Sequence, residues 1–190
     1  MIGTLASAAV SVSAPARPAP LAERLDAEAF RRFHAEVAPR LWAYVRSHVA
    51  DRGEADDLAQ EAFTRVLAST FTPESDEHLV RYLYRTAGNL LRDRGRAAAR
   101  GTTVPLDEAE RGETPRPAVR IDLERALRAL RPRDRELLWL AHVEGIEQRA
   151  IAELVGVSAG SVRVMLFRAR RRLAELMRPD ANHREIRHVD

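Results

Sequence analysis

The sequence predicts an all-α protein: two small helical domains joined by a flexible linker, the C-terminal one a helix-turn-helix. Three observations favour this fold. Apolar residues recur at steps of three and four along most of 21–178, and the alternation typical of strands is nearly absent. Residues 101–118, GTTVPLDEAERGETPRPA, interrupt the pattern with two glycines and three prolines. We therefore expect domains at 21–100 and 119–178, with 101–118 as the linker.

Both ends of the chain lack a helical pattern. Residues 1–20 are small and punctuated by prolines, so we expect a disordered arm. A secretory signal is the alternative, but the start lacks basic residues and its apolar stretch is weak. Residues 179–190 are expected to form a polar tail after Pro179 ends the last helix.

The first domain is expected to hold three helices, over about 26–49, 54–69 and 76–97, with Pro39 kinking the first. The apolar spacing places one side of each helix inward. The expected inward residues are Phe30, Phe33, Val37, Leu41, Tyr44, Val45 and His48 in the first helix, Ala55, Leu58, Ala62 and Val66 in the second, and Leu79, Leu83, Ala87 and Leu90 in the third.

The second domain is expected to hold helices at about 119–129, 133–143, 147–155 and 158–177, of which the last two form the helix-turn-helix. That motif needs a small residue where the helices cross and a residue that tolerates a left-handed turn. Ala152 and Gly156 supply these, and Ser158 is a natural cap for the following helix. The apolar residues expected to wedge the pair apart are Ile151, Val155, Val157 and Val162.

The last helix has two contrasting faces. Its buried positions are expected to be Val162, Leu166, Ala169, Leu173 and Leu176, and its outer positions Gly160, Arg163, Val164, Phe167, Arg168 and Arg171. Guanidinium groups bind guanine edges or clamp phosphates, and an aromatic ring among them can pack on a thymine methyl or a sugar. This pattern predicts insertion into a DNA groove, the alternative being an arginine-rich face that only meets solvent.

Charge is unevenly distributed. The net charge is only +3, and all 31 basic residues are arginine. Positions 51–61 hold five acidic residues against Arg52, whereas positions 81–100 hold six arginines against Asp93. Opposite charge on different faces of one domain indicates different partners.

Several classes of function are excluded. The chain has no cysteine, and no apolar run approaches the roughly 20 residues of a membrane helix. The six histidines lack ligand spacing, and Asp56, Asp57 and Glu61 resemble a magnesium-binding cluster only faintly, because the first two diverge by about 100° on a helix. We expect a cytoplasmic protein that is not an enzyme, with no metal, cofactor, small-molecule substrate or membrane insertion.

Three stretches carry a resemblance to the extracytoplasmic-function, or group IV, sigma factors of bacterial RNA polymerase. DDLAQEAFTRVL, residues 56–67, resembles the family's polymerase-binding helix, and YLYRTAGNLLRDRGR, residues 82–96, resembles its W-L-Y-R-I-A-R-N stretch. Residues 130–173 are similar to the family's second DNA-binding domain, including the recognition helix. The resemblance implies binding to core RNA polymerase and to promoter DNA, promoter recognition in transcription initiation, and possible control by an anti-sigma protein.

The resemblance also implies roles for particular residues. Polymerase-binding residues would be Asp57, Gln60, Glu61 and Arg65, although such a charged face is often only a solvated one. Contacts to the minus-ten element would come from Asn89, Phe71, Arg81, Arg85, Arg92 and Arg96, and contacts to the upstream, minus-thirty-five box from Arg163, Phe167, Arg168, Arg171 and Arg149. The alternative for Asn89 is a surface amide without a role. The alternative for Phe71 is a ring that packs in the core instead of stacking on a base.

The chain departs from the family pattern at several positions. Gly88 replaces an arginine next to Asn89, Ala150 replaces a common glutamate, and Val164 with Met165 replaces a Ser-Arg pair. The linker has few groups that would fix the angle between the domains, so we expect that angle to vary. The alternative function is a stand-alone helix-turn-helix regulator whose first domain senses a ligand or dimerises.

Overall fold

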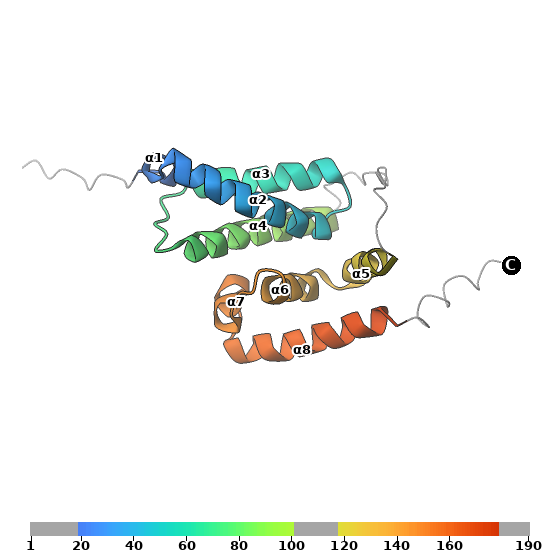
Figure 1. Ribbon diagram of the computed structural model, residues 1–190. Coiled ribbons are helices and arrows are strands. Elements are labelled where there is room, and N and C mark those ends of the chain that lie inside the picture. The colour runs from blue at the N-terminus through green and yellow to red at the C-terminus, as the bar shows by residue number, and fades with distance from the viewer. Residues whose placement is uncertain (1–18, 101–117, 179–190) are drawn as a thin grey trace, which may run out of the picture.

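The computed structural model describes residues 19–100 and 118–178, and every regular element in these ranges is a helix (Figure 1). Nearly all of the arm, linker and tail expected from the sequence lies outside the described residues. The helices are α1 (Leu21–Arg24), α2 (Ala27–His48), α3 (Arg52–Ala68), α4 (Asp76–Ala99), α5 (Ala118–Ala129), α6 (Pro132–His142), α7 (Gln148–Val155) and α8 (Ala159–Leu176).

The first domain is built from α1 to α4. Asp26, Asp51 and Ser75 cap the three long helices, each side chain accepting a hydrogen bond from a backbone N–H three residues on. These caps explain why the helices begin where they do. Helix α2 continues through Pro39, at which the sequence led us to expect a kink.

The expected inward stripes of α2, α3 and α4 form the core of this domain. Leu41, Val45 and Leu83 are fully buried, and Phe30, Phe33, His48 and Leu58 are half-buried. The sequence analysis missed α1, which Leu21 anchors by burying its side chain and donating its N–H to the Ser69 carbonyl at 2.7 Å. A four-residue helix is too short to show a periodic pattern.

The second domain contains the expected helix-turn-helix. Gly156 adopts φ +69° at the end of α7, and the axes of α7 and α8 are bent by 96° at this turn. Ile151 and Val162 from the two helices are fully buried in the same core cluster as Leu137 and Leu166. The Ser158 hydroxyl accepts a hydrogen bond from the Ser161 N–H at 3.2 Å, as the sequence predicted for this cap.

The two domains pack directly on each other, with α6 and α7 lying against α4 and α5 against the end of α2 (Figure 1). The rings of Tyr44 and Trp139 meet across this interface with centroids 6.0 Å apart. Arg135 donates to the Ser47 carbonyl of α2. The sequence analysis expected the angle between the two domains to vary because it considered the linker alone. In the structure, contacts between helix faces hold the two domains together.

Candidate nucleic-acid and polymerase interfaces

The outer face of α8 presents the side chains expected to contact DNA. Arg163, Phe167, Arg168 and Arg171 are all exposed, whereas Val162, Leu166 and Ala169 on the opposite face are buried. Phe167 is 66% exposed, and such exposure is unusual for a large aromatic side chain. The arrangement offers apolar contact between positive charges, as a groove-inserting helix requires.

The arginines on this face differ in whether they form ion pairs with other side chains. Within the described residues, Arg163 and Arg168 form no ion pair, whereas Arg171 pairs with Glu175 at 3.2 Å. Arg149 is exposed in the first turn of α7, next to the N-terminus of that helix. Unpaired guanidinium groups can bind base edges or phosphates without first breaking an internal contact.

Helix α4 carries the second set of expected DNA contacts. Because they follow one another at steps of four, four, three and four, Arg81, Arg85, Asn89, Arg92 and Arg96 lie on one face of the helix. Asn89 and Arg85 are exposed. Arg92 donates to the Asn89 amide oxygen at 2.6 Å, and Arg96 pairs with Asp93.

Phe71 lies in the loop before α4 and is half-buried. Its ring stacks on Tyr82, with centroids 3.9 Å apart and planes 3° from parallel, and the His78 ring meets it edge-on at 4.8 Å. Arg24 also donates to its carbonyl at 2.6 Å. These contacts favour a ring that packs in the core over a ring that is free to stack on a base.

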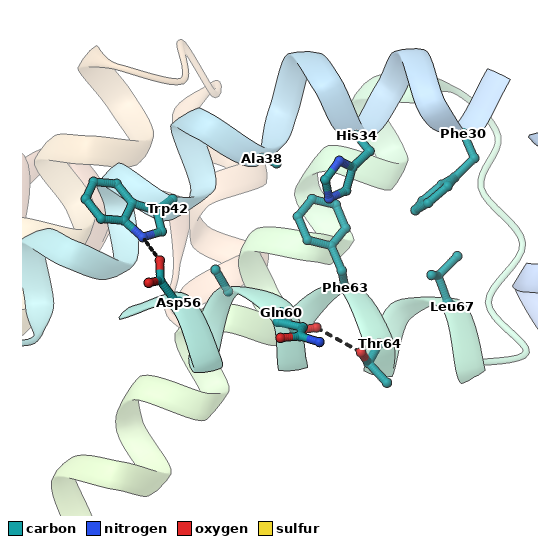
Figure 2. A pocket seen from close by; sticks show the side chains of 10 residues that line it. Phe30, His34, Ala38, Trp42, Asp56, Gln60, Phe63, Thr64 and Leu67 are labelled. Carbon is teal, nitrogen blue, oxygen red and sulfur yellow. Dashed lines mark hydrogen bonds between the residues drawn. The ribbon is translucent and has the colours of Figure 1, made fainter. Parts of the chain in front are cut away.

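A groove lies between α2 and α3, and α3 contributes Asp56 and Gln60 to its lining (Figure 2). Asp57, Gln60 and Glu61 are exposed, and Glu61 pairs with Arg65 at 2.6 Å. The groove has a volume of about 350 Å³. Its apolar and aromatic lining consists of Phe30, His34, Ala38, Trp42, Ala59, Phe63 and Leu67.

Sequence reasoning missed this groove. Trp42 lies beside the inward stripe of α2, and its indole N–H donates to the Asp56 carboxylate at 2.5 Å (Figure 2). The His34 and Phe63 rings approach to 4.7 Å between their centroids. The available signal was a tryptophan and a histidine off the core stripe of an amphipathic helix, which indicates a second, partly exposed apolar surface.

Neither a metal site nor a membrane span emerges from the described part of the chain. Over residues 19–100 and 118–178, no three His, Asp or Glu side chains gather closely enough to hold a metal ion. No single helix in these ranges is long and apolar enough to cross a membrane, although α7 and α8 would have the length and composition if they were not bent by 96°.

Two helical domains, one exposing an arginine and phenylalanine face on a helix-turn-helix and the other a basic helix face, define a DNA-binding transcription factor. The Sigma-70 region 2 model matches residues 33–101, and the Sigma-70 region 4 model matches residues 120–173. The chain is 30% identical over 157 residues to the ECF RNA polymerase sigma factor SigF of Caulobacter vibrioides, covering 80% of this chain and 88% of that protein. It belongs to the extracytoplasmic-function family of RNA polymerase sigma factors.

One further relative and two solved structures are also similar to this chain. The sigma factor CarQ of Myxococcus xanthus is 30% identical over 158 residues, covering 79% of this chain and 90% of that protein. The structure is similar to RpoE bound to the anti-sigma factor NepR from Bartonella quintana, with a TM-score of 0.64, 25% identity and coverage of 80% and 99% of the two chains. CnrH bound to the cytosolic domain of CnrY gives a TM-score of 0.60 at 25% identity, covering 82% of this chain and 92% of that one.

Family membership settles the choice between the two functions left open by the sequence. The protein is a sigma factor, which binds core RNA polymerase and directs promoter recognition and transcription initiation, rather than a stand-alone regulator. Region 2 corresponds to α2–α4 and region 4 to α5–α8.

Proposed function

We propose that this sigma factor binds its partners through three separate surfaces. Its two domains extend over residues 21–100 and 119–178. The first surface is the acidic edge of α3, formed by Asp57, Gln60, Glu61 and Arg65, together with the adjoining aromatic groove. Exposed carboxylates on the same helix as an apolar groove suit a partner helix that presents both basic and apolar side chains. That partner is core RNA polymerase.

The second surface is the outer face of α8, which enters the major groove at the upstream promoter box. Arg163 and Arg168 contact base edges, and Phe167 packs on a thymine methyl or a sugar. Arg171 and Arg149 hold phosphates. The observation that carries this proposal is the 66% exposure of Phe167 between two unpaired arginines of the described chain.

The third surface is the basic face of α4, which holds the melted minus-ten element. Opening a duplex costs a few kcal/mol of unstacking for each base, so bases must be trapped once they leave the stack. Asn89 offers a donor and an acceptor to one base edge. The backbone of the strand is held by Arg81, Arg85, Arg92 and Arg96. Phe71 fixes the loop before α4, because its ring stacks on Tyr82 of that helix.

The protein catalyses no reaction itself, needs no cofactor and acts in the cytoplasm beside the polymerase. The similar structure of RpoE was solved in complex with the anti-sigma factor NepR. We infer that an anti-sigma protein also binds this chain, because the groove on α3 and the face of α8 are exposed recognition surfaces that regulation has to cover.

Run-off transcription tests the proposal as a whole. Core RNA polymerase is incubated with and without this chain on a library of genomic promoter fragments. Specific transcripts that require the chain are expected, and their absence with an active core enzyme would refute the sigma-factor function. A pull-down with Asp57→Arg and Glu61→Arg tests the first surface, with Glu74→Arg as an exposed control on the same domain.

A further inference from the structure

Helix α1 lies at the same end of the first domain as residues 69–75, the loop that joins α3 to α4 (Figure 1). The buried Leu21 side chain anchors α1 there, and the Leu21 N–H donates to the Ser69 carbonyl at 2.7 Å. At the other end of this four-residue helix, the Arg24 side chain also reaches the loop. Both ends of α1 therefore contact a loop that begins 48 positions after Leu21.

Arg24 holds two consecutive loop residues with one guanidinium group. Its Nη2 donates to the Phe71 carbonyl at 2.6 Å, and its Nη1 donates to the Thr72 hydroxyl at 2.9 Å. The guanidinium is planar and its donors form a rigid fork, so two acceptors that bind it together are fixed relative to each other. Because the loop has no regular secondary structure, such bonds replace those that a helix would supply to its backbone.

The other side of the loop packs on the first turns of α4. The Phe71 ring stacks on Tyr82, and the Glu74 N–H donates to His78 Nδ1 at 3.3 Å. Arg81, which directly precedes Tyr82, begins the basic face that is proposed to hold the melted strand. The loop is therefore held between α1 and the N-terminal end of that face.

We propose that Arg24 is a positioning residue for recognition of the minus-ten element, because it holds loop 69–75 in the conformation that receives a base as it leaves the stack. This inference rests on the proposed role of the α4 face in holding the melted strand. A loop that is ordered before binding loses less conformational freedom when the base arrives, and it favours the base that matches its fixed shape. Arg24 is exposed and lies outside the core cluster, so its removal leaves the packing of the domain intact.

The first measurement follows the loop itself, in the full-length protein without DNA or polymerase. Hydrogen–deuterium exchange read by mass spectrometry reports how often the backbone amides of residues 69–75 open to solvent. Arg24→Ala is expected to speed exchange in this loop about two- to tenfold, the range set by the net contribution of a lost hydrogen bond. Unchanged exchange would overturn the inference.

The second measurement follows base selection. A promoter that the chain transcribes with core polymerase is randomised across the minus-ten element, the upstream box is held constant, and the transcripts are counted by sequencing. Arg24→Ala is expected to reduce the preference for the best base about two- to tenfold at one or more minus-ten positions. Preferences in a second library, randomised in the upstream box, should not change. An equal loss of transcript from every minus-ten variant would overturn the inference, since selection would then be intact.

Arg31→Ala is the matched control. It removes the same charge from an exposed position of the first domain, and the partner of Arg31, Glu28 at 2.6 Å, lies in the same helix. Neither loop exchange nor base selection is expected to change in this variant. Effects as large as those of Arg24→Ala would assign the result to charge alone and overturn the inference.

Thr72→Val provides an independent variant, because it removes one acceptor of Arg24 and leaves the Phe71 carbonyl in place. Its loop is expected to exchange faster than that of the unmodified chain and slower than that of Arg24→Ala. Adding Thr72→Val to Arg24→Ala should change exchange little further, because the two residues act through one contact. Fully additive effects on exchange would show that Arg24 does not act through this loop.

Asn89→Ala separates this inference from the proposed function. If Asn89→Ala flattens the minus-ten preference and Arg24→Ala leaves it intact, the strand-holding face stands and the role of Arg24 is refuted. If the unmodified chain selects no minus-ten sequence with an active core enzyme, the proposed function itself is refuted. Faster loop exchange together with a flattened minus-ten preference in Arg24→Ala supports the inference.

Discussion

Arg40 on α2 and Glu144 in the turn after α6 form an ion pair across the two domains, with Nη2 and Oε2 2.7 Å apart. The Glu144 side chain is fully buried, whereas the Arg40 side chain remains 41% exposed. The Trp139 indole N–H also donates to Glu144, at 3.3 Å. This buried carboxylate therefore joins the end of α6 to the first domain.

The Glu144→Gln variant is expected to lower the free energy of unfolding by about 1–2 kcal/mol, because it leaves Arg40 without its buried partner while solvent still reaches the guanidinium. Urea denaturation at neutral pH measures the change. Glu36→Gln is the control, since Glu36 pairs with the same arginine at 3.7 Å but is 75% exposed. A loss of equal size in both variants would contradict the importance of burial.

Arg135 is expected to be the least replaceable arginine of the second domain. Its guanidinium is buried, which lowers its pKa, and it donates to the carbonyls of Leu127, Arg128 and Leu130 as well as that of Ser47. Arg135→Lys keeps the charge but cannot reach all four acceptors, so we expect a loss of about 2–3 kcal/mol in stability. Thermal unfolding measures it, and the exposed Arg131→Lys should change little.

Stability is expected to fall on mild acidification because of His48. Burial lowers its pKa from 6.5 to about 4, the nearby Arg135 charge acting in the same direction, and its Nδ1 donates to the Tyr44 carbonyl at 2.9 Å. The unfolded chain takes up this proton below about pH 6.5 and the folded chain only near pH 4, so stability is lost as the pH falls between these values. From pH 7 to 5 the loss is about 1–2 kcal/mol.

Urea denaturation at pH 7, 6 and 5 tests this, and His48→Gln should flatten the dependence by that amount. A parallel dependence in the two proteins would assign the effect to other groups. His48 lines a cavity between the two domains. The other charged and titratable residues that line this cavity are Tyr44, Arg92, Arg94, Arg131, Arg133 and Glu136, and the Arg135 charge also acts on His48.

Base recognition by α8 is expected to depend on position. Arg163→Ala should cost about 1–3 kcal/mol on the preferred upstream box and relax discrimination at one base pair. The measurement is polymerase-dependent promoter binding over single-base variants of that box. Arg172→Ala is the control, because Arg172 is exposed but pairs with Glu175 at 3.4 Å, away from the outer face. A uniform loss on all sequences would assign Arg163 to phosphate binding.

How much of the molecule the sequence predicts depends on whether the signal is local. The helix-turn-helix followed from one glycine, one serine cap and a stripe of apolar residues, and Gly156 and Ser158 adopt the conformations expected of them. The exposed outer face of α8 followed from the same stripe. Each of these features is settled by residues within a few turns of one another.

The interface between the domains could not be predicted in the same way. At Gly88 the sequence shows only that an arginine of the family pattern is replaced, and it does not show that Glu136, 48 positions later, packs against this position. The buried charges Asp134, Arg135 and Glu136 also interrupt the apolar pattern at the start of α6. Such contacts depend on how two folded domains pack on each other, and the local periodicity of the sequence does not encode that packing.

Helix α8 lies at the outer edge of the molecule, with α5, α6 and α7 between it and the first domain (Figure 1). The exposed arginines of its outer face are therefore accessible to intact double-stranded DNA while the two domains remain packed on each other. We therefore expect α8 to reach the upstream box as an intact duplex without any rearrangement of the first domain.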